Sequence, residues 1–115
     1  MNLATLAMEL HLENLTPTLP LGRDVTAGYS SDLLSDVLAG APAGGVLVTV
    51  QVHLNVVAVA VHADLAAVIF AGGRRPEAAV IERAAQEGVV LLASGQPSFD
   101  LVGGLYALGL RGRTE

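Results

Sequence analysis

One apolar stretch, too long to be a single strand, constrains the fold of this chain more than any other feature. From Val46 to Val61, valine, leucine and alanine recur at alternate or consecutive positions. Strands usually run about 5–6 residues and rarely exceed about 10, so an element must end inside this stretch. The next apolar run, Leu65–Phe70, also predicts a buried strand. Because two parallel strands are joined by a crossover, usually a helix, we predict a strand over Val46–Val52 and a helix over Asn55–Ala63, capped by Asn55.

The rest of the chain alternates in the same way between short apolar runs and helical patterns. Helices are predicted over Asn2–Leu10, over Ser30–Gly40, over Pro76–Glu87 with Gly88 closing it, and over Phe99–Leu108 with Ser98 as its cap. Further strands are predicted around Leu12 and Leu15, over Asp24–Tyr29 and over Val89–Leu92. The sequence therefore predicts a single α/β domain over residues 1–115, a three-layer α/β/α sandwich around a largely parallel or mixed sheet of about five short strands. A polar, frayed tail is expected over Arg111–Glu115.

The segment after Tyr29 carries the clearest helix signals in the chain. Ser30 and Ser31 precede an apolar pattern of helical period and suit the N-cap. Asp32 suits the positive end of the helix dipole, and Gly40 suits the position after the last turn. The predicted buried stripe of this helix is Leu33, Leu34, Val37 and Leu38.

Composition excludes several classes of function. The chain is 52% hydrophobic and only 15% charged, which excludes disorder and predicts that a partner covers part of the surface. Its formal net charge is −5, and all its basic residues apart from histidine are arginines, so nucleic-acid binding is not expected. Without lysine there is no P-loop lysine or Schiff base. Without cysteine there is no disulfide, thiolate zinc site, cysteine-ligated iron–sulfur cluster or cysteine nucleophile.

The sequence shows neither the pattern of a signal peptide nor that of a membrane-spanning helix. The first residues carry Glu9 and His11 and no basic region, so no signal peptide is expected. The run Val56–Ala71 is interrupted by His62 and Asp64 and is shorter than the roughly 20 residues of a membrane span. We therefore expect a cytoplasmic protein that has no contact with a membrane.

Four polar side chains stand where the central strand gives way to the helix: Thr49, Gln51, His53 and Asn55. Buried polar groups need partners or they cost stability. In one interpretation, Gln51, His53 and Asn55 hydrogen-bond a polar ligand or a partner chain. In the other, the row consists of strand-end and helix-cap residues that bond to the backbone. Ligands of open α/β sheets lie beyond the carboxyl ends of the strands, so this row is the first candidate site.

Two further loops follow predicted strands. Gly72 and Gly73 can bring backbone N–H groups to a phosphate, with Arg74 or Arg75 adding charge, or they can form a tight strand-to-helix turn. The loop Ser94–Ser98 has the same two interpretations, an anion loop or a helix cap. The candidate ligand-binding residues are therefore Thr49, Gln51, His53, Asn55, Gly72, Gly73, Arg74, Ser94 and Ser98.

Catalytic and metal sites are not expected. Asp32 and Asp36 lie four apart, as paired catalytic carboxylates do, yet nothing nearby in the sequence supplies a nucleophile or electrophile. His11, His53 and His62 lack the spacing of metal ligands. We therefore predict no catalytic residue, no metal and no cofactor.

Several segments resemble a known group of proteins. They read G-Y-S-S-D-L-L-S-D-V-L-A, V-T-V-Q-V-H-L-N-V-V-A-V-A-V, A-A-V-I-F-A-G-G-R-R-P and G-V-V-L-L-A-S. On these segments the chain resembles small stand-alone DRTGG-domain proteins, over Leu3–Leu110. That group is similar to the N-terminal domain of HPr kinase/phosphorylase and to the DRTGG module of some CBS-domain pyrophosphatases. The resemblance implies a regulatory or oligomerising α/β/α domain, and in the pyrophosphatases such modules accompany adenine-nucleotide sensing.

Three hypotheses for the function follow. The leading one is a non-enzymatic regulatory module that forms a homo-oligomer, with a dimer favoured, and binds an adenine nucleotide or other small anion at the strand ends. The second is a protein-interaction adaptor for a kinase or redox enzyme complex, without a small ligand. The third, the weakest, is an enzyme that uses His53 as acid or base.

Overall fold

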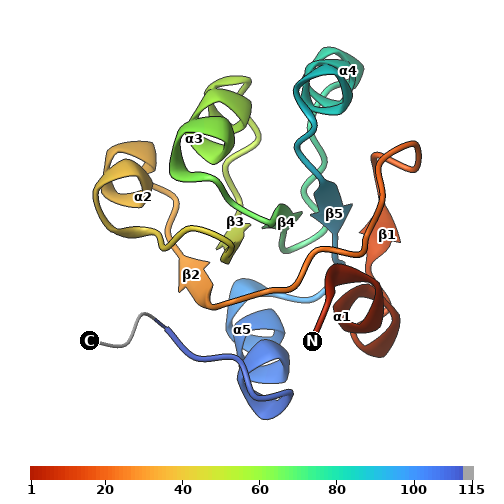
Figure 1. The fold of residues 1–115 in the computed structure, drawn as a ribbon, viewed down its shortest axis with the longest axis vertical. Helices are drawn as coiled ribbons and strands as arrows, with labels where there is room; N and C mark the ends of the chain where they lie inside the picture. The colour runs from red at the N-terminus through yellow and green to blue at the C-terminus, as the bar shows by residue number, and fades with distance from the viewer. Residues whose placement is uncertain (113–115) are drawn as a thin grey trace.

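The computed structural model describes residues 1–112, which form a five-stranded sheet with helices on both faces (Figure 1). The helices are α1 (Leu3–Glu9), α2 (Leu34–Gly40), α3 (Asn55–Ala63), α4 (Ala78–Glu87) and α5 (Ser98–Ala107). The strands are β1 (Glu13–Asn14), β2 (Gly28–Ser30), β3 (Val46–Thr49), β4 (Ala67–Phe70) and β5 (Leu91–Ala93). Their spatial order is β1-β5-β4-β3-β2, with β1 antiparallel to β5 and every other pair parallel. The predicted α/β fold is confirmed.

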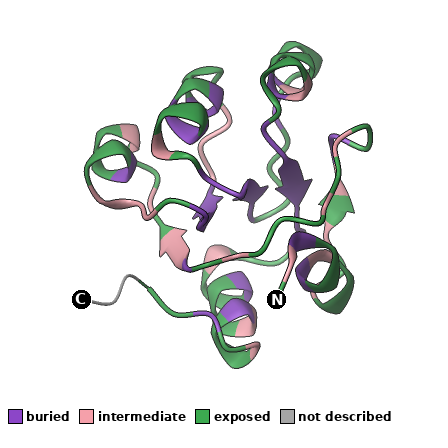
Figure 2. Cartoon of the chain, in the orientation of Figure 1, coloured by how far each residue is buried: buried purple, intermediate pink, exposed green. Residues whose placement is uncertain are grey.

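Successive strand residues point to opposite faces of the sheet and build two separate cores. Leu47, Val68 and Phe70 pack on the face covered by α2, α3 and α4. Val48 and Ile69 pack on the face covered by α1 and α5. Because both faces are covered, the central strands are buried at every position, whereas the edge strands β1 and β2 are not (Figure 2).

The long apolar stretch divides into a strand and a helix, as predicted, but the strand is shorter than expected. β3 ends at Thr49 instead of Val52. The N–H of Val50 donates to the Asp32 carboxylate at 2.8 Å, so the backbone leaves the ladder at this point. The helix α3 has the predicted bounds.

The expected cap of α3 was wrong by one residue. Leu54 occupies the N-cap position, and Asn55 is the first residue of the helix. The N–H of Asn55 donates to His53 Nδ1 at 3.0 Å, so the histidine two residues upstream supplies the bond that a capping side chain would make.

The helix α2 begins at Leu34, later than its signals predicted. Ser30 is the last residue of β2, and Ser31 forms a local turn in which its Oγ accepts from the Leu33 N–H at 3.2 Å. Asp32 lies outside the helix because its carboxylate is bonded to the end of β3. The predicted cap by Ser30 or Ser31 and the predicted place of Asp32 in the first turn were therefore wrong, because Leu33 occupies the N-cap position.

The predicted buried stripe of α2 was also largely wrong. Val37 alone in that stripe is buried, Leu34 is half-buried, and Leu33 and Leu38 are 65% and 47% exposed. The helix covers the outer end of the sheet, beside α3, so only one row of its side chains reaches the core (Figure 1).

Two other helix starts differ slightly from expectation. The helix α4 begins at Ala78, and Pro76, which is buried, precedes the cap residue Glu77. Pro97 caps α5, and Ser98 is its first residue. Gly88 closes α4 as predicted, with a left-handed φ of 75°.

The strand expected over Asp24–Tyr29 is restricted to Gly28–Ser30. The N–H groups of Val25 and Thr26 donate to Met1 and Gly44 carbonyls instead of to a neighbouring strand. The C-terminal tail was predicted to be frayed, but Arg111 is held by a 2.9 Å bond from the Gly28 N–H to its carbonyl. Residues 113–115 lie outside the described residues. None of the described helices is both long and apolar enough to cross a membrane.

Candidate functional site

The polar row Thr49–Asn55 forms a series of bonds to its own backbone. Thr49 Oγ1 donates to Asp32 Oδ1 at 2.9 Å and accepts from the Gln51 N–H at 3.0 Å. Gln51 Oε1 then accepts from the His53 N–H at 3.1 Å. With His53 Nδ1 accepting from the Asn55 N–H, the first three side chains of the row each hold the N–H two residues further on. The row thus builds the loop that joins β3 to α3.

The row does not converge on a common ligand position. Thr49 is 1% exposed, Gln51 is half-buried, and His53 and Asn55 are exposed. The Asn55 N–H occupies Nδ1 of His53, which leaves Nε2 as the ring nitrogen available to a partner.

The backbone N–H groups of the glycine turn after β4 are already bonded to the neighbouring loop. Gly72 and Gly73 have left-handed φ angles of 67° and 74°. Their N–H groups donate to the carbonyls of Gln96 and Ser94, at 2.7 and 3.0 Å. The turn therefore locks the β4–α4 loop onto the β5–α5 loop, and a phosphate bound here would be held by side chains instead of by these amides.

The loop after β5 is stabilised in the same way. Ser94 is buried, and its Oγ accepts from the Gln96 N–H at 3.0 Å. Ser98, by contrast, lies at the start of α5, faces the hollow beside Phe99, and is separated from the other candidates by the loop.

Three of the candidate residues meet in one hollow at the carboxyl ends of β4 and β5. Gly73, Arg74 and Ser94 line it together with His11, Glu13, Arg75, Ala93 and Gly95. Its volume is about 280 Å³. We call it the basic hollow, because its lining contains two arginines and a histidine against a single carboxylate in a chain of net charge −5.

An ion pair fixes one wall of the basic hollow. Both terminal guanidinium nitrogens of Arg75 donate to the Glu13 carboxylate, with NH2 to Oε2 at 3.0 Å. The hydrogen bond from Arg75 and its positive charge hold the pKa of Glu13 below its ordinary value, and the same contact raises the pKa of Arg75. The side chain of Arg74, which is exposed, has no hydrogen-bond or ion-pair partner among the described residues. The uncompensated positive charge of the basic hollow therefore belongs to Arg74.

The sequence did not indicate that His11 and Glu13 would reach this site. They come from β1 and the turn before it, and β1 is antiparallel, so its first residue pairs with Ala93 at the carboxyl end of β5. A two-residue edge strand carries too little pattern to predict its partner.

The two aspartates considered as a catalytic pair serve different contacts. Asp36 accepts from the Tyr29 hydroxyl at 2.9 Å, whereas Asp32 holds the end of β3. Within residues 1–112, no group of three histidine or acidic side chains is arranged to hold a metal ion.

Comparison of the chain with protein families and with curated proteins found no match. Among solved structures, it is similar to the crystal structure of the CBS and DRTGG domains of the regulatory region of Clostridium perfringens pyrophosphatase, complexed with activator, diadenosine tetraphosphate. The TM-score is 0.67, and 14% of residues are identical. The match covers 88% of this chain and 44% of that chain, so this chain spans less than half of its length. The fold is DRTGG-like.

Proposed function

We propose that this chain is a non-catalytic regulatory module that senses a small phosphate-bearing ligand, with an adenine nucleotide as the first candidate. The observation that carries the proposal is the basic hollow. It lies at the edge of the sheet where α/β folds bind ligands, and it contains the unpaired Arg74 guanidinium. A guanidinium binds a phosphate through charge-assisted hydrogen bonds.

Two features support the choice of ligand class. The basic hollow is small and open, which suits a phosphate group better than a whole nucleotide, so the base would lie outside it. The fold is also shared with part of a regulatory region that was crystallised with diadenosine tetraphosphate, an adenine nucleotide. A relationship to the N-terminal domain of HPr kinase/phosphorylase stays a prediction from the sequence.

Isothermal titration calorimetry tests the proposal. ATP, AMP, diadenosine tetraphosphate and inorganic phosphate would be titrated into the wild-type chain and into Arg74→Ala. A charge-assisted hydrogen bond contributes about 1.5–3 kcal/mol, so we expect Arg74→Ala to weaken nucleotide binding at least about tenfold. Arg83→Ala is the matched control, because Arg83 is an exposed arginine on α4 that does not line the basic hollow.

The outcomes are distinct. If none of the four compounds gives a heat of binding, the nucleotide is removed from the proposal. Binding that is unaffected by Arg74→Ala but lost in Arg83→Ala would place the ligand between α3 and α4 instead, where Arg83 lines another hollow.

The adaptor hypothesis has its own supporting observation. Leu38, Leu54 and Val61 on the outer side of α2 and α3 are 47%, 44% and 48% exposed. Exposed apolar groups on adjacent helices are typical of protein contacts. Co-purification of a stoichiometric partner from the native host that is lost in Val61→Glu would favour an adaptor, and retention of that partner would count against this surface.

A further inference from the structure

The helix α5 is apolar on two sides, although the sheet covers only one. Leu101 and Leu105 are buried against the sheet. Phe99, Val102 and Tyr106 lie on the outer side and are 88%, 37% and 58% exposed. These three residues recur at the i, i+3, i+7 spacing of one helix face. We call them, together with Gly103, the α5 stripe.

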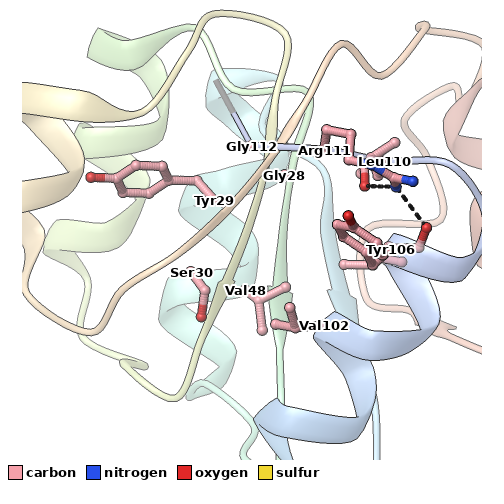
Figure 3. A pocket seen from close by; sticks show the side chains of 10 residues that line it. Gly28, Tyr29, Ser30, Val48, Val102, Tyr106, Leu110, Arg111 and Gly112 are labelled. Atoms are coloured by element: carbon pink, nitrogen blue, oxygen red, sulfur yellow. Dashed lines mark hydrogen bonds between the residues drawn. The ribbon is translucent and has the colours of Figure 1, made fainter. Parts of the chain in front are cut away.

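The α5 stripe continues onto the edge strand β2. Ser30, Val102 and Tyr106 line two adjoining hollows. One, of about 560 Å³, runs along α5. The other, of about 210 Å³, lies between α5 and β2 (Figure 3). The shape of this surface is fixed by Arg111. Its guanidinium lies 3.6 Å from the centre of the Tyr106 ring and donates to the Tyr106 carbonyl at 2.9 Å. Its own carbonyl accepts from Gly28 of β2, so the surface is already organised without a partner.

The order of residues in the α5 stripe is self-complementary. If a second copy of α5 runs antiparallel, with the two-fold axis between Val102 and Gly103, Phe99 faces Tyr106 of the second copy. Val102 then faces Gly103 of the second copy. A Cβ at Gly103 would meet nothing within 4 Å, so this position leaves room for the opposing side chain. Such a reciprocal contact is the signature of an interface with two-fold symmetry.

Charge favours the same arrangement. Asp100 is in the first turn of α5, and Arg111 follows its last turn. An antiparallel pair brings the acidic start of each helix toward the basic end of the other and opposes the two helix dipoles.

We propose that two copies of this chain associate through antiparallel contact of their α5 stripes, extended by the neighbouring surface of β2. The three exposed side chains offer on the order of 350 Å² per copy, since a fully buried aromatic side chain contributes about 150–250 Å². This is less than the roughly 800 Å² per partner of a standard interface, so we expect a weak dimer that forms only at high protein concentration.

Sedimentation equilibrium between about 1 and 300 µM tests the association. We expect a monomer–dimer equilibrium for the wild type and a monomer at all concentrations for Phe99→Glu. Phe99 is almost fully exposed, so this variant keeps its core, which circular dichroism and thermal unfolding would verify. Val61→Glu, a matched change on the opposite layer, should dimerise like the wild type. A monomeric wild type at 300 µM, or a dimer lost in Val61→Glu and kept in Phe99→Glu, would overturn the proposal.

Disulfide trapping tests the direction of the helices, since the chain has no cysteine of its own. Copies with Phe99→Cys mixed with copies with Tyr106→Cys should form mixed disulfide dimers on mild oxidation. Phe99→Cys alone should not cross-link, because in an antiparallel pair the two positions 99 lie about 10 Å apart along the axis. Efficient cross-linking of Phe99→Cys to itself would refute the antiparallel arrangement. The dimer test is independent of nucleotide binding, since it uses no ligand and another surface.

Discussion

Replacing Thr49 by valine removes the hydroxyl group on which the polar row depends, at almost constant side-chain volume. The group is 1% exposed, donates to Asp32 and accepts from the Gln51 N–H. The bond to a carboxylate is worth about 1.5–3 kcal/mol and the neutral bond about 0.5–1.5 kcal/mol. Asp32 is exposed and Gln51 is only half-buried, which favours the lower half of both ranges. We therefore expect Thr49→Val to lower the free energy of unfolding by about 2–3 kcal/mol.

Urea unfolding followed by circular dichroism measures this loss, and Thr18→Val is the control. Thr18 is exposed in the loop before Leu19, so its change should stay within about 0.5 kcal/mol. A double-mutant cycle with Asp32→Ala should give a coupling energy of at least about 1 kcal/mol, because the two side chains share one bond. If Thr49→Val is as stable as the wild type, the row does not hold the end of β3, and its polar groups are available for a ligand.

Two further predictions concern the ion pair and the helix end. Because the pKa of Glu13 is lowered by Arg75, its contribution to stability is complete above its ordinary pKa and disappears as the pH falls through the lowered pKa. The difference in stability between the wild type and Glu13→Gln should therefore be largest near neutral pH and vanish in acid, and urea unfolding over a pH series would contradict this if the difference were constant. Gly88 has a φ of 75°, so Gly88→Ala should cost about 1–2 kcal/mol. Gly22→Ala, at an open position, should change stability by less than about 0.5 kcal/mol in the same assay.

The layers of the fold were predictable because they follow from chain length and apolar pattern alone. The stretch from Val46 to Val61 is too long for one strand. It must therefore contain a strand followed by a crossover helix, which leads to the next buried strand in a parallel sheet. Helix ends were less predictable, since Ser31 forms a local bond to the Leu33 N–H that serves equally in a helix cap and in the loop before one.

The site depends on contacts that no local pattern encodes. The Asp32 carboxylate reaches the end of β3 from 17 positions earlier in the chain, and the bond between Arg75 and Glu13 joins residues 62 positions apart. The exposure of Phe99 was also unpredictable, because its spacing fits a buried face of α5 as well as an exposed one. Sequence could therefore place Arg74 and Ser94 at strand ends without showing which side chains they would meet.

The basic hollow and the α5 stripe are joined by one short loop, which gives the two proposals a testable connection. The loop after β5 accepts the N–H groups of Gly72 and Gly73 through the carbonyls of Gln96 and Ser94, and it leads directly into α5. A ligand that tightens the basic hollow thus acts on the segment that positions Phe99.

By linkage, any change that nucleotide makes in the dimerisation constant must equal the change that dimerisation makes in nucleotide affinity. Sedimentation with and without saturating nucleotide, compared with titrations of the wild type and Phe99→Glu, measures both sides of this equality. If nucleotide changes the dimerisation constant by one factor and dimerisation changes nucleotide affinity by another, the two equilibria have been assigned to the wrong states. If neither quantity changes, the loop joins the two sites without coupling them.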